Sequence, residues 1–421
     1  MKVWRHYLLL LLIFFGLPGI GQALEFLEEA GLHGFLDARG GVRTGNDPYQ
    51  RDTSLLETRL QLALEHYGEQ VNLQVRGDLL YDNVAAHHTP YLETGEGAFD
   101  LREATLTFFP TPTVDVKLGR QILTWGTGDL LFINDLFPKD WQSFFTGRDV
   151  EYLKAPSDAL MVSLFPAFAN IDLVYTPRFD SDRYISGERL SFYGFNGEQV
   201  ATDKPDQWFQ DHELNMRVSK NLRGYELAAY GYRGYWKSPS GFDQNTGLAL
   251  FPRLNVYGIS LRGELQGGIF NLEGGYYDSR KDTGGDDPAI PNSELRFLAG
   301  YERELLQELT GSLQFYLEQM QDYGAYRQSL PGGQPAQDEN RQVWTLRLTK
   351  QLLSQKLTLS LFSYWSPTDE DYYLRPQVRY KLTDAWLLTC GGNLFGGDRD
   401  HTFFGQFEDN TNIYAGARYS F

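Results

Sequence analysis

Charged side chains recur at every second position in many segments of this 421-residue chain. In one segment Arg375, Arg379 and Lys381 all fall at alternate positions, and in another Arg59 and Gln61 do so. A wall of like charges attracts ions of one sign and repels the other. Charges at alternate positions also pair across neighbouring strands, which stabilises a polar surface without selecting any ion. Both interpretations stay open for each of these residues.

A second set of candidate residues lies in the connection 123–156, which reads LTWGTGDLLFINDLFPKDWQSFFTGRDVEYLKAP. Its many aromatic and aliphatic side chains are unusual for a solvated loop and need a surface to pack against. We expect this connection to fold into the interior of the protein and pack against a wall of β-strands, so that its charged side chains face solute. The candidates for this constriction are Trp125, Asp129, Asp135, Lys139, Asp140, Trp141 and Arg148. The alternative is an external cap or a partner-binding surface.

Histidines and acidic clusters give little support to catalysis or metal binding. His87 and His88 fall in an expected loop with no nucleophile motif near them, so solvated side chains are the better interpretation. The acidic groups at 369–371 and 398–400 lack the ordered spacing and turn glycine of an EF-hand loop. The single cysteine, Cys390, excludes an intramolecular disulfide framework and any multi-cysteine metal cluster. We therefore expect no enzyme activity, no cofactor and no metal.

Composition excludes several classes of protein. Hydrophobic residues make up 42% of the chain and charged residues 22%, and no long apolar run follows the N-terminus. Neither a disordered acidic tail nor a bundle of membrane-spanning helices fits this composition. The formal charge of −17 speaks against nucleic acid as a partner, because phosphates need a basic face. Lys2 and Arg5 precede an apolar block at 8–15 and a Gly-Gln-Ala site ending at Ala23, which predicts a cleaved signal peptide over residues 1–23.

The elements that position these residues are segments of about ten residues in which polar and apolar positions alternate. In TRLQLALEHYG, for example, Leu60 and Leu62 share one face and Arg59 lies on the other. Such alternation indicates strands with a different solvent on each side. Eight short links alternate with nine long ones, which predicts an antiparallel transmembrane β-barrel of about 18 strands over residues 24–421, with short periplasmic turns and long extracellular loops. Pro376 is unusual for a paired strand.

A closed sheet of about 18 strands is wide enough for a water-filled interior, whereas about eight strands fill their interior with side chains. We expect the polar face of each strand to line this space. The strand phases assign to the pore lining Arg59, Arg76, Asp78, Lys117, Arg217, Arg262, Arg296, Arg347, Arg375, Arg379 and Arg418. Acidic residues on the same faces, such as Glu65, Glu103 and Glu273, make the expected lumen mixed in charge.

The last segment, NIYAGARYSF, provides an independent check, because Ile413, Ala417 and Tyr419 share one face and Phe421 follows them. A secreted soluble β-sandwich would also alternate, but its outward face would carry charges. Here the apolar faces are aliphatic in mid-strand and aromatic towards the ends, as in the girdles of membrane barrels. No repeat of fixed length appears in the sequence, which argues against a β-propeller.

Residues 118–126, LGRQILTWG, resemble the strand-and-loop signature of large Gram-negative porin-like barrels, a group that includes alginate-export channels. The resemblance implies a channel in the cell outer membrane for small hydrophilic solutes, anionic ones included. The partners it implies are outer-membrane lipids, lipopolysaccharide and the barrel-assembly machinery. Alginate-export channels pass a polyanion through a strongly basic lumen, and the mixed lumen expected here departs from that pattern. The alternatives are an export or secretion conduit that works with a periplasmic partner, and a structural or enzymatic barrel.

Overall fold

The computed structural model describes residues 31–85 and 87–421. The predicted signal peptide, residues 1–23, lies outside the described residues. None of the helices formed by the described residues is long and apolar enough to cross a membrane.

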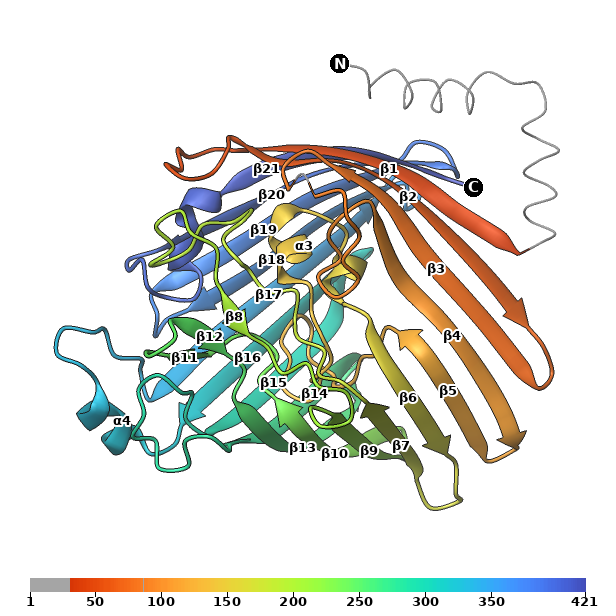
Figure 1. The fold of residues 1–421 in the computed structure, drawn as a ribbon. Coiled ribbons are helices and arrows are strands. Elements are labelled where there is room, and N and C mark those ends of the chain that lie inside the picture. The colour runs from red at the N-terminus through yellow and green to blue at the C-terminus, as the bar shows by residue number, and fades with distance from the viewer. Residues whose placement is uncertain (1–30, 86) are drawn as a thin grey trace.

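Eighteen antiparallel strands form one closed barrel (Figure 1), which confirms the predicted fold class and strand number. The barrel closes where the first and last strands pair, from Phe35 opposite Ser420 to Arg43 opposite Asn412. Its strands are β1 (Leu32–Arg43), β2 (Thr53–Tyr67), β3 (Val71–Asp82), β4 (Phe99–Thr111), β5 (Val114–Gln121), β6 (Ser157–Leu164), β7 (Asn170–Thr176), β9 (Glu213–Leu222), β10 (Tyr225–Tyr235), β13 (Arg253–Leu265), β14 (Gly268–Ser279), β15 (Glu294–Leu306), β16 (Leu309–Met320), β17 (Asn340–Leu352), β18 (Leu357–Ser366), β19 (Asp371–Lys381), β20 (Trp386–Gly397) and β21 (Asn412–Ser420).

Burial alternates along the strands because successive side chains point to opposite faces of the sheet. In β17, Val343 and Thr345 are buried inside the barrel, whereas Trp344 and Leu346 are exposed on its outer surface. The outer surface is apolar, and in a membrane it contacts lipid, which explains why a hydrophobic side chain occurs at every second position.

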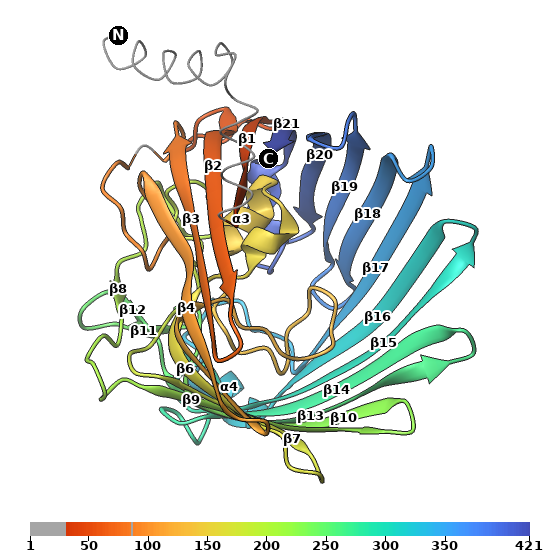
Figure 2. The ribbon, with the colours of Figure 1, turned by 90° about the vertical axis from the view of Figure 1, so that its right-hand side faces the viewer.

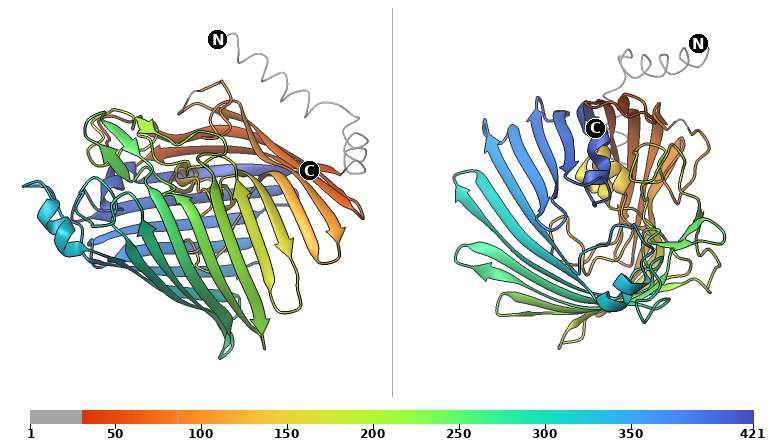
Figure 3. Two further views of the ribbon diagram at one scale, coloured as in Figure 1. Left: turned by 60° about the horizontal axis from the view of Figure 1, so that its bottom comes forward. Right: turned by 90° about the vertical axis from the view of Figure 1, so that its left-hand side faces the viewer.

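Short turns join the strands at one rim and long connections at the other (Figure 3). We call these the short-turn rim and the long-loop rim. The shortest turns have two residues, as at 223–224, and the longest connections are 122–156 and 177–212. Pro376 does lie within a strand, and the pairing of β19 with β20 is interrupted at Arg375 and Pro376. Proline has no N–H to donate, which accounts for the interruption.

The smaller elements belong to the long connections. A three-stranded sheet of β8 (Thr202–Asp203), β11 (Gly241–Asp243) and β12 (Leu248–Leu250) stands apart from the barrel. The helices α3 (Trp141–Thr146) and η1 (Val150–Leu153) lie in 122–156, and α4 (Tyr323–Ser329) and η2 (Gly405–Asn410) lie in later connections. The largest buried apolar cluster combines residues of 122–156 with inward-facing residues of the barrel wall.

Candidate functional site

Residues 122–156, which we call the inner segment, connect β5 to β6. Their helix α3 lies inside the ring of strands when the barrel is viewed from either end (Figures 2 and 3). The inner segment is therefore the part of the chain best placed to control what passes through the barrel. Its contacts with the wall are of two chemical kinds.

Phe144 and Phe145 hold one side of the inner segment by apolar contacts. Phe145 is 2% exposed, and its ring centroid lies 5.3 Å from those of Tyr373 in β19 and Phe395 in β20. Phe144 meets Tyr373 edge-on at 5.8 Å. Full burial of one such side chain contributes about 1.5–3 kcal/mol, so the two phenylalanines favour a docked segment strongly.

Wall tyrosines also bind the backbone of the inner segment. The Tyr277 hydroxyl donates to the carbonyl oxygen of Ile133 at 2.6 Å, and the Tyr364 hydroxyl donates to that of Leu130 at 2.6 Å. Gly275 of β14 permits this approach, because a Cβ at that position would lie 2.7 Å from Ile133 Cγ2. A larger residue at 275 would push the segment away from the wall.

Glu273 of β14 is the main polar anchor on this side. Its carboxylate accepts hydrogen bonds from the Gly128 N–H at 2.8 Å and from Asn134 Nδ2 at 2.9 Å. Nearby, Arg347 of β17 forms a two-bond ion pair with the Asp129 carboxylate, at 2.8 Å from its Nη2 atom. Two parallel bonds fix the orientation of both partners, so this pair sets where the carboxylate stands.

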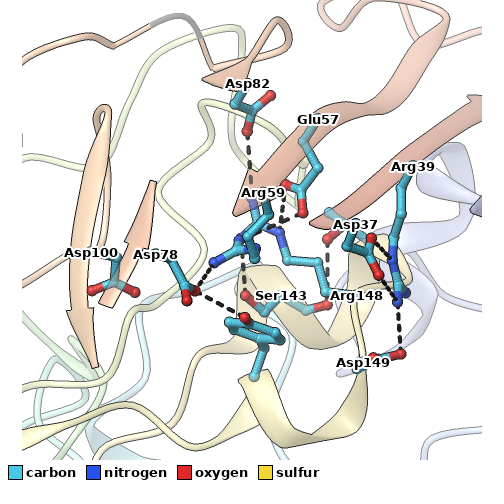
Figure 4. A network of polar contacts seen from close by, with 12 residues as sticks. Asp37, Arg39, Glu57, Arg59, Asp78, Asp82, Asp100, Ser143, Arg148 and Asp149 are labelled. Atoms are coloured by element: carbon cyan, nitrogen blue, oxygen red, sulfur yellow. Dashed lines mark hydrogen bonds and ion pairs between the residues drawn. The ribbon is translucent and has the colours of Figure 1, made fainter. Parts of the chain in front are cut away.

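The opposite side of the inner segment is held by ion pairs to β2 and β3 (Figure 4). The Arg148 guanidinium lies 2.7 Å from the Glu57 carboxylate and 3.4 Å from that of Asp82. Burial disfavours the charged form of Arg148, but Glu57 and the other acidic neighbours hold its pKa above the ordinary value. The buried charge is thus retained only because its partners are present.

Asp149 ties the inner segment to the seam where the barrel closes. Arg39 of β1 donates to this carboxylate at 2.8 Å (Figure 4). Arg418 of β21 contacts the same carboxylate. Burial alone would raise the pKa of Asp149, but Arg39 and Arg418 hold it below the usual range. Arg418 also reaches Asp37 at 3.0 Å, so the same arginine joins wall and segment.

Tyr152 of η1 covers two residues that the sequence assigns to the pore lining. Its hydroxyl donates to Asp78 at 2.9 Å, and the Arg59 guanidinium carbon lies 4.2 Å from its ring centroid. Arg59 also pairs with Asp78, and these residues are 3% and 0% exposed. The expectation that both line open space is corrected here: they face inward, but they lie beneath the inner segment.

A neighbouring connection, 177–212, supports the start of α3. Asp182 accepts hydrogen bonds from the backbone N–H of Lys139 at 2.7 Å and from Trp141 Nε1 at 3.1 Å. Burial raises the pKa of Asp182, and these donors oppose that rise. Two long connections therefore fold together inside the long-loop rim.

Arg183 completes this junction between the connections. Its guanidinium lies 2.8 Å from Asp100 of β4 and 3.4 Å from Asp140. Burial opposes its charge, yet Asp100 and Asp140 raise the pKa of Arg183 above its ordinary value. Asp140 also caps α3, because its carboxylate accepts the N–H of Ser143 at 2.7 Å.

The charged residues of the inner segment differ from expectation in one respect. Asp135, Lys139 and Asp140 are buried, and only 12% of the Arg148 side chain is exposed. Asp135 and Lys139 pair with each other at 3.0 Å. We expected these side chains to face solute, but neighbouring elements supply partners that bury them. The Asp129 side chain, 34% exposed, is accessible even in its pair with Arg347.

The remaining predicted wall residues fall into two groups. Most are paired: Arg217 with Asp172 at 2.7 Å, Arg76 with Glu103 at 2.7 Å, and Arg296 with both Glu294 and Glu318. Trp125 packs against Phe137 at 5.0 Å between ring centroids and lies under the Arg217 guanidinium. Arg375 is buried and donates to the carbonyl oxygen of Arg148 at 2.8 Å.

Lys117, Arg262 and Arg379 form the second group. They share the strand phase of inward-facing neighbours, and no carboxylate of the described residues lies within ion-pair distance of them. Arg262 and Arg379 are exposed, and Lys117 is half-buried. No sequence signal identifies Asp149, Tyr152 or Asp182 as anchors, because each acts on a partner far away in the chain.

One group of described residues could hold a divalent cation. His87, Glu96 and Glu188 bring three potential ligand atoms within 4.8 Å of one another at the long-loop rim. His87 Nε2 already lies 2.6 Å from the Glu188 carboxylate, which is the distance of an ion pair. We interpret the group as a bridge between two connections.

Comparison with known proteins bears on the fold. No family model matches the chain, and no curated protein matches it. Among solved structures, Acinetobacter baumannii OccAB1 aligns with a TM-score of 0.56 at 10% identity, over 94% of this chain and 97% of that one. The chain has the fold of a porin-like outer-membrane β-barrel. A. baumannii OccAB3 aligns with a TM-score of 0.55 at 12% identity, over 93% of this chain and 98% of that one. Pseudomonas aeruginosa OccD3 (OpdP) aligns with a TM-score of 0.52 at 12% identity, over 93% of this chain and 91% of that one.

The porin-like fold supports an outer-membrane location. The signal peptide over residues 1–23 and the absence of enzyme activity stay predictions.

Proposed function

We propose that this porin-like barrel is an outer-membrane channel for small hydrophilic solutes and that the inner segment narrows its passage. The observation that carries the proposal is the double anchoring of the inner segment inside a closed 18-stranded barrel. A barrel of this strand number has room for water, and a segment fixed inside it reduces that room. We further propose that outer-membrane lipids and lipopolysaccharide surround the barrel and that the barrel-assembly machinery inserts it into the membrane.

The charges near the short-turn rim support passage of anions along one side. Arg379 is exposed on the inner face of β19, and Lys381, exposed on the same face, pairs with Asp384 at 3.0 Å. Glu226 and Glu264 are exposed on the inner faces of β10 and β13, seven and six strands from β19 around the barrel, and Arg262 lies opposite Glu226. An excess of one charge sign on each wall separates the paths of anions and cations. We propose that the β19 side carries anionic solutes.

Single-channel recording in planar bilayers tests the narrowing. Deletion of residues 129–146 removes the Arg347 pair and both anchoring phenylalanines, and we expect single-channel conductance to rise about twofold or more, with weaker ion selectivity. Deletion of 331–336, an exposed stretch of another long connection, is the matched control and should leave conductance unchanged. A folded 129–146 deletion variant that conducts like the parent would refute the narrowing.

The reversal potential in a salt gradient tests the ionic path. Arg379→Gln removes an inward charge that has no ion pair among the described residues, so we expect permeability to shift towards cations. Arg327→Gln, in the last turn of α4, changes the net charge by the same amount but lies in a long connection outside the barrel strands. This variant should shift the reversal potential little. Equal shifts from the two variants would contradict the proposed path.

A further inference from the structure

A cavity of about 520 Å³ opens between the inner segment, the neighbouring long connections and the barrel wall. Its lining includes Phe132 and Trp141 from the inner segment, Ile185 and Phe192 from 177–212, and Phe403 from the last long connection. The cavity therefore lies towards the long-loop rim. Its volume falls in the range of small-molecule sites.

The cavity is lined by the apolar side chains that the core leaves partly uncovered. All seven partly buried hydrophobic residues that pack on the main core cluster line it, namely Leu131, Phe132, Leu136, Trp141, Ile185, Phe192 and Trp236. Phe403 adds a ring that is 44% exposed. Covering this surface with an apolar ligand removes apolar area from water, which is favourable.

The charged residues of the cavity are already neutralised by protein partners. Lys139 lies 3.0 Å from Asp135, and its Nζ donates to the Phe137 carbonyl oxygen at 2.6 Å. Glu318 lies between Arg296 at 3.3 Å and Arg341 at 3.0 Å. Asp182 has no ion pair, but its carboxylate accepts hydrogen bonds from the Lys139 N–H, Trp141 Nε1 and Ser238 Oγ. A charged ligand would lose its hydration here and find only paired cations and a carboxylate that is already hydrogen-bonded, which is unfavourable.

We propose that this cavity binds uncharged solutes with an apolar ring before they cross the inner segment. The inference rests on the proposed channel function and names a class of solute for it. Ring-shaped solutes fit because Phe132, Trp141 and Phe403 line the cavity, and aromatic rings pack favourably against one another. Sugars fit poorly, because their many hydroxyl groups would meet mostly apolar lining and paired charges.

Binding to the full-length barrel in phosphatidylcholine nanodiscs tests the proposal by isothermal titration calorimetry, with empty nanodiscs subtracted. The probes are acetophenone, benzoate of similar size and shape, and glucose. We expect acetophenone to saturate one site per barrel, and benzoate and glucose to bind at least about tenfold more weakly, which corresponds to about 1.4 kcal/mol. Benzoate that binds as tightly as acetophenone would overturn the choice of an uncharged solute.

Two variants assign the binding to this cavity. Phe403→Ala removes an exposed lining ring, and we expect at least about a fivefold loss of acetophenone affinity. Phe168→Ala removes a 65% exposed ring at the short-turn rim and should leave the affinity unchanged. Equal affinity in parent and Phe403→Ala, or an isotherm identical to that of empty nanodiscs, would overturn the proposal.

Conductance of the same preparation separates this inference from the channel function. A barrel that binds acetophenone in the cavity but carries no current would support the cavity and refute the channel. A conducting barrel without saturable acetophenone binding would refute the cavity alone.

Discussion

Replacement of Phe145 by alanine should release the inner segment while leaving the barrel assembled. Phe145 is 2% exposed, and five rings surround it at centroid distances of 5.2–6.1 Å, those of Trp141, Phe144, Tyr373, Phe395 and Phe407. Truncation of a phenylalanine in such a site costs about 3–5 kcal/mol. None of the strand-to-strand pairing depends on this side chain, so the cost falls on docking of the segment.

A loss of 3–5 kcal/mol raises the population of undocked segment by about two to three and a half orders of magnitude. Single-channel recordings of Phe145→Ala should therefore show frequent transitions to a larger conductance. Limited proteolysis should cut the variant within 122–156 faster than the parent, because undocking exposes backbone that the wall protects. Heat-modifiable migration in gels checks that the barrel is folded.

Phe168→Ala is the matched control, because Phe168 lies in a short turn and is 65% exposed. This control should behave like the parent in both assays. If folded Phe145→Ala shows the conductance and the cleavage rate of the control, the segment is held by something other than the aromatic cluster and the reasoning fails.

Three further predictions concern assembly, the lipid face and pH. Replacing both Tyr419 and Phe421 by serine should lower the amount of heat-modifiable barrel in the outer membrane, and equal amounts would count against the expected assembly role. Leu359→Arg puts a charge on the outer face and should lower the free energy of unfolding, measured by urea titration in vesicles, by about 2–4 kcal/mol. Ser360→Arg puts the charge on the inner face and should be tolerated. Equal losses of stability in the two variants would contradict the assignment of inner and outer faces. Burial and Glu213 raise the pKa of Asp180 to about 6. Between about pH 4 and pH 6 the folded state therefore keeps a proton on Asp180 that the unfolded state has released. The free energy of unfolding should fall by about 3 kcal/mol as the pH rises across this range. Asp180→Asn should remove this slope, and an unchanged slope in urea titrations would show that another group titrates.

The barrel could be predicted because its information is local. In each strand, alternation of polar and apolar residues over about ten positions indicates which residues face inward, and each turn interrupts that alternation. Even the exception at Pro376 disturbs only the adjoining ladder positions. The inner segment was also visible in sequence as a connection too apolar for solvent, because Phe144, Phe145 and their neighbours must pack on something.

The fate of individual charges in the site could not be predicted in the same way. Asp140 and Arg148 look like solute-facing residues until their partners are known, and those partners lie in the connection 177–212 and in the wall. The same reasoning applies to Asp78, which inward phasing identifies correctly but which Tyr152 covers. Strand phase decides which side a residue faces, whereas long-range packing decides whether water reaches it.

The two anchors of the inner segment differ in how they respond to conditions. Salt does not screen the apolar contacts of Phe145 and its ring neighbours, because these side chains carry no charge. The ion pairs of Arg148 and Asp149 are buried, and buried pairs are screened by salt much less than exposed ones. Salt screens the exposed charge of Arg379 more strongly, and it also screens the partly exposed pair of Asp129 with Arg347. A change in ion selectivity with salt should therefore reflect the passage of solutes past these exposed groups, while the position of the inner segment stays constant.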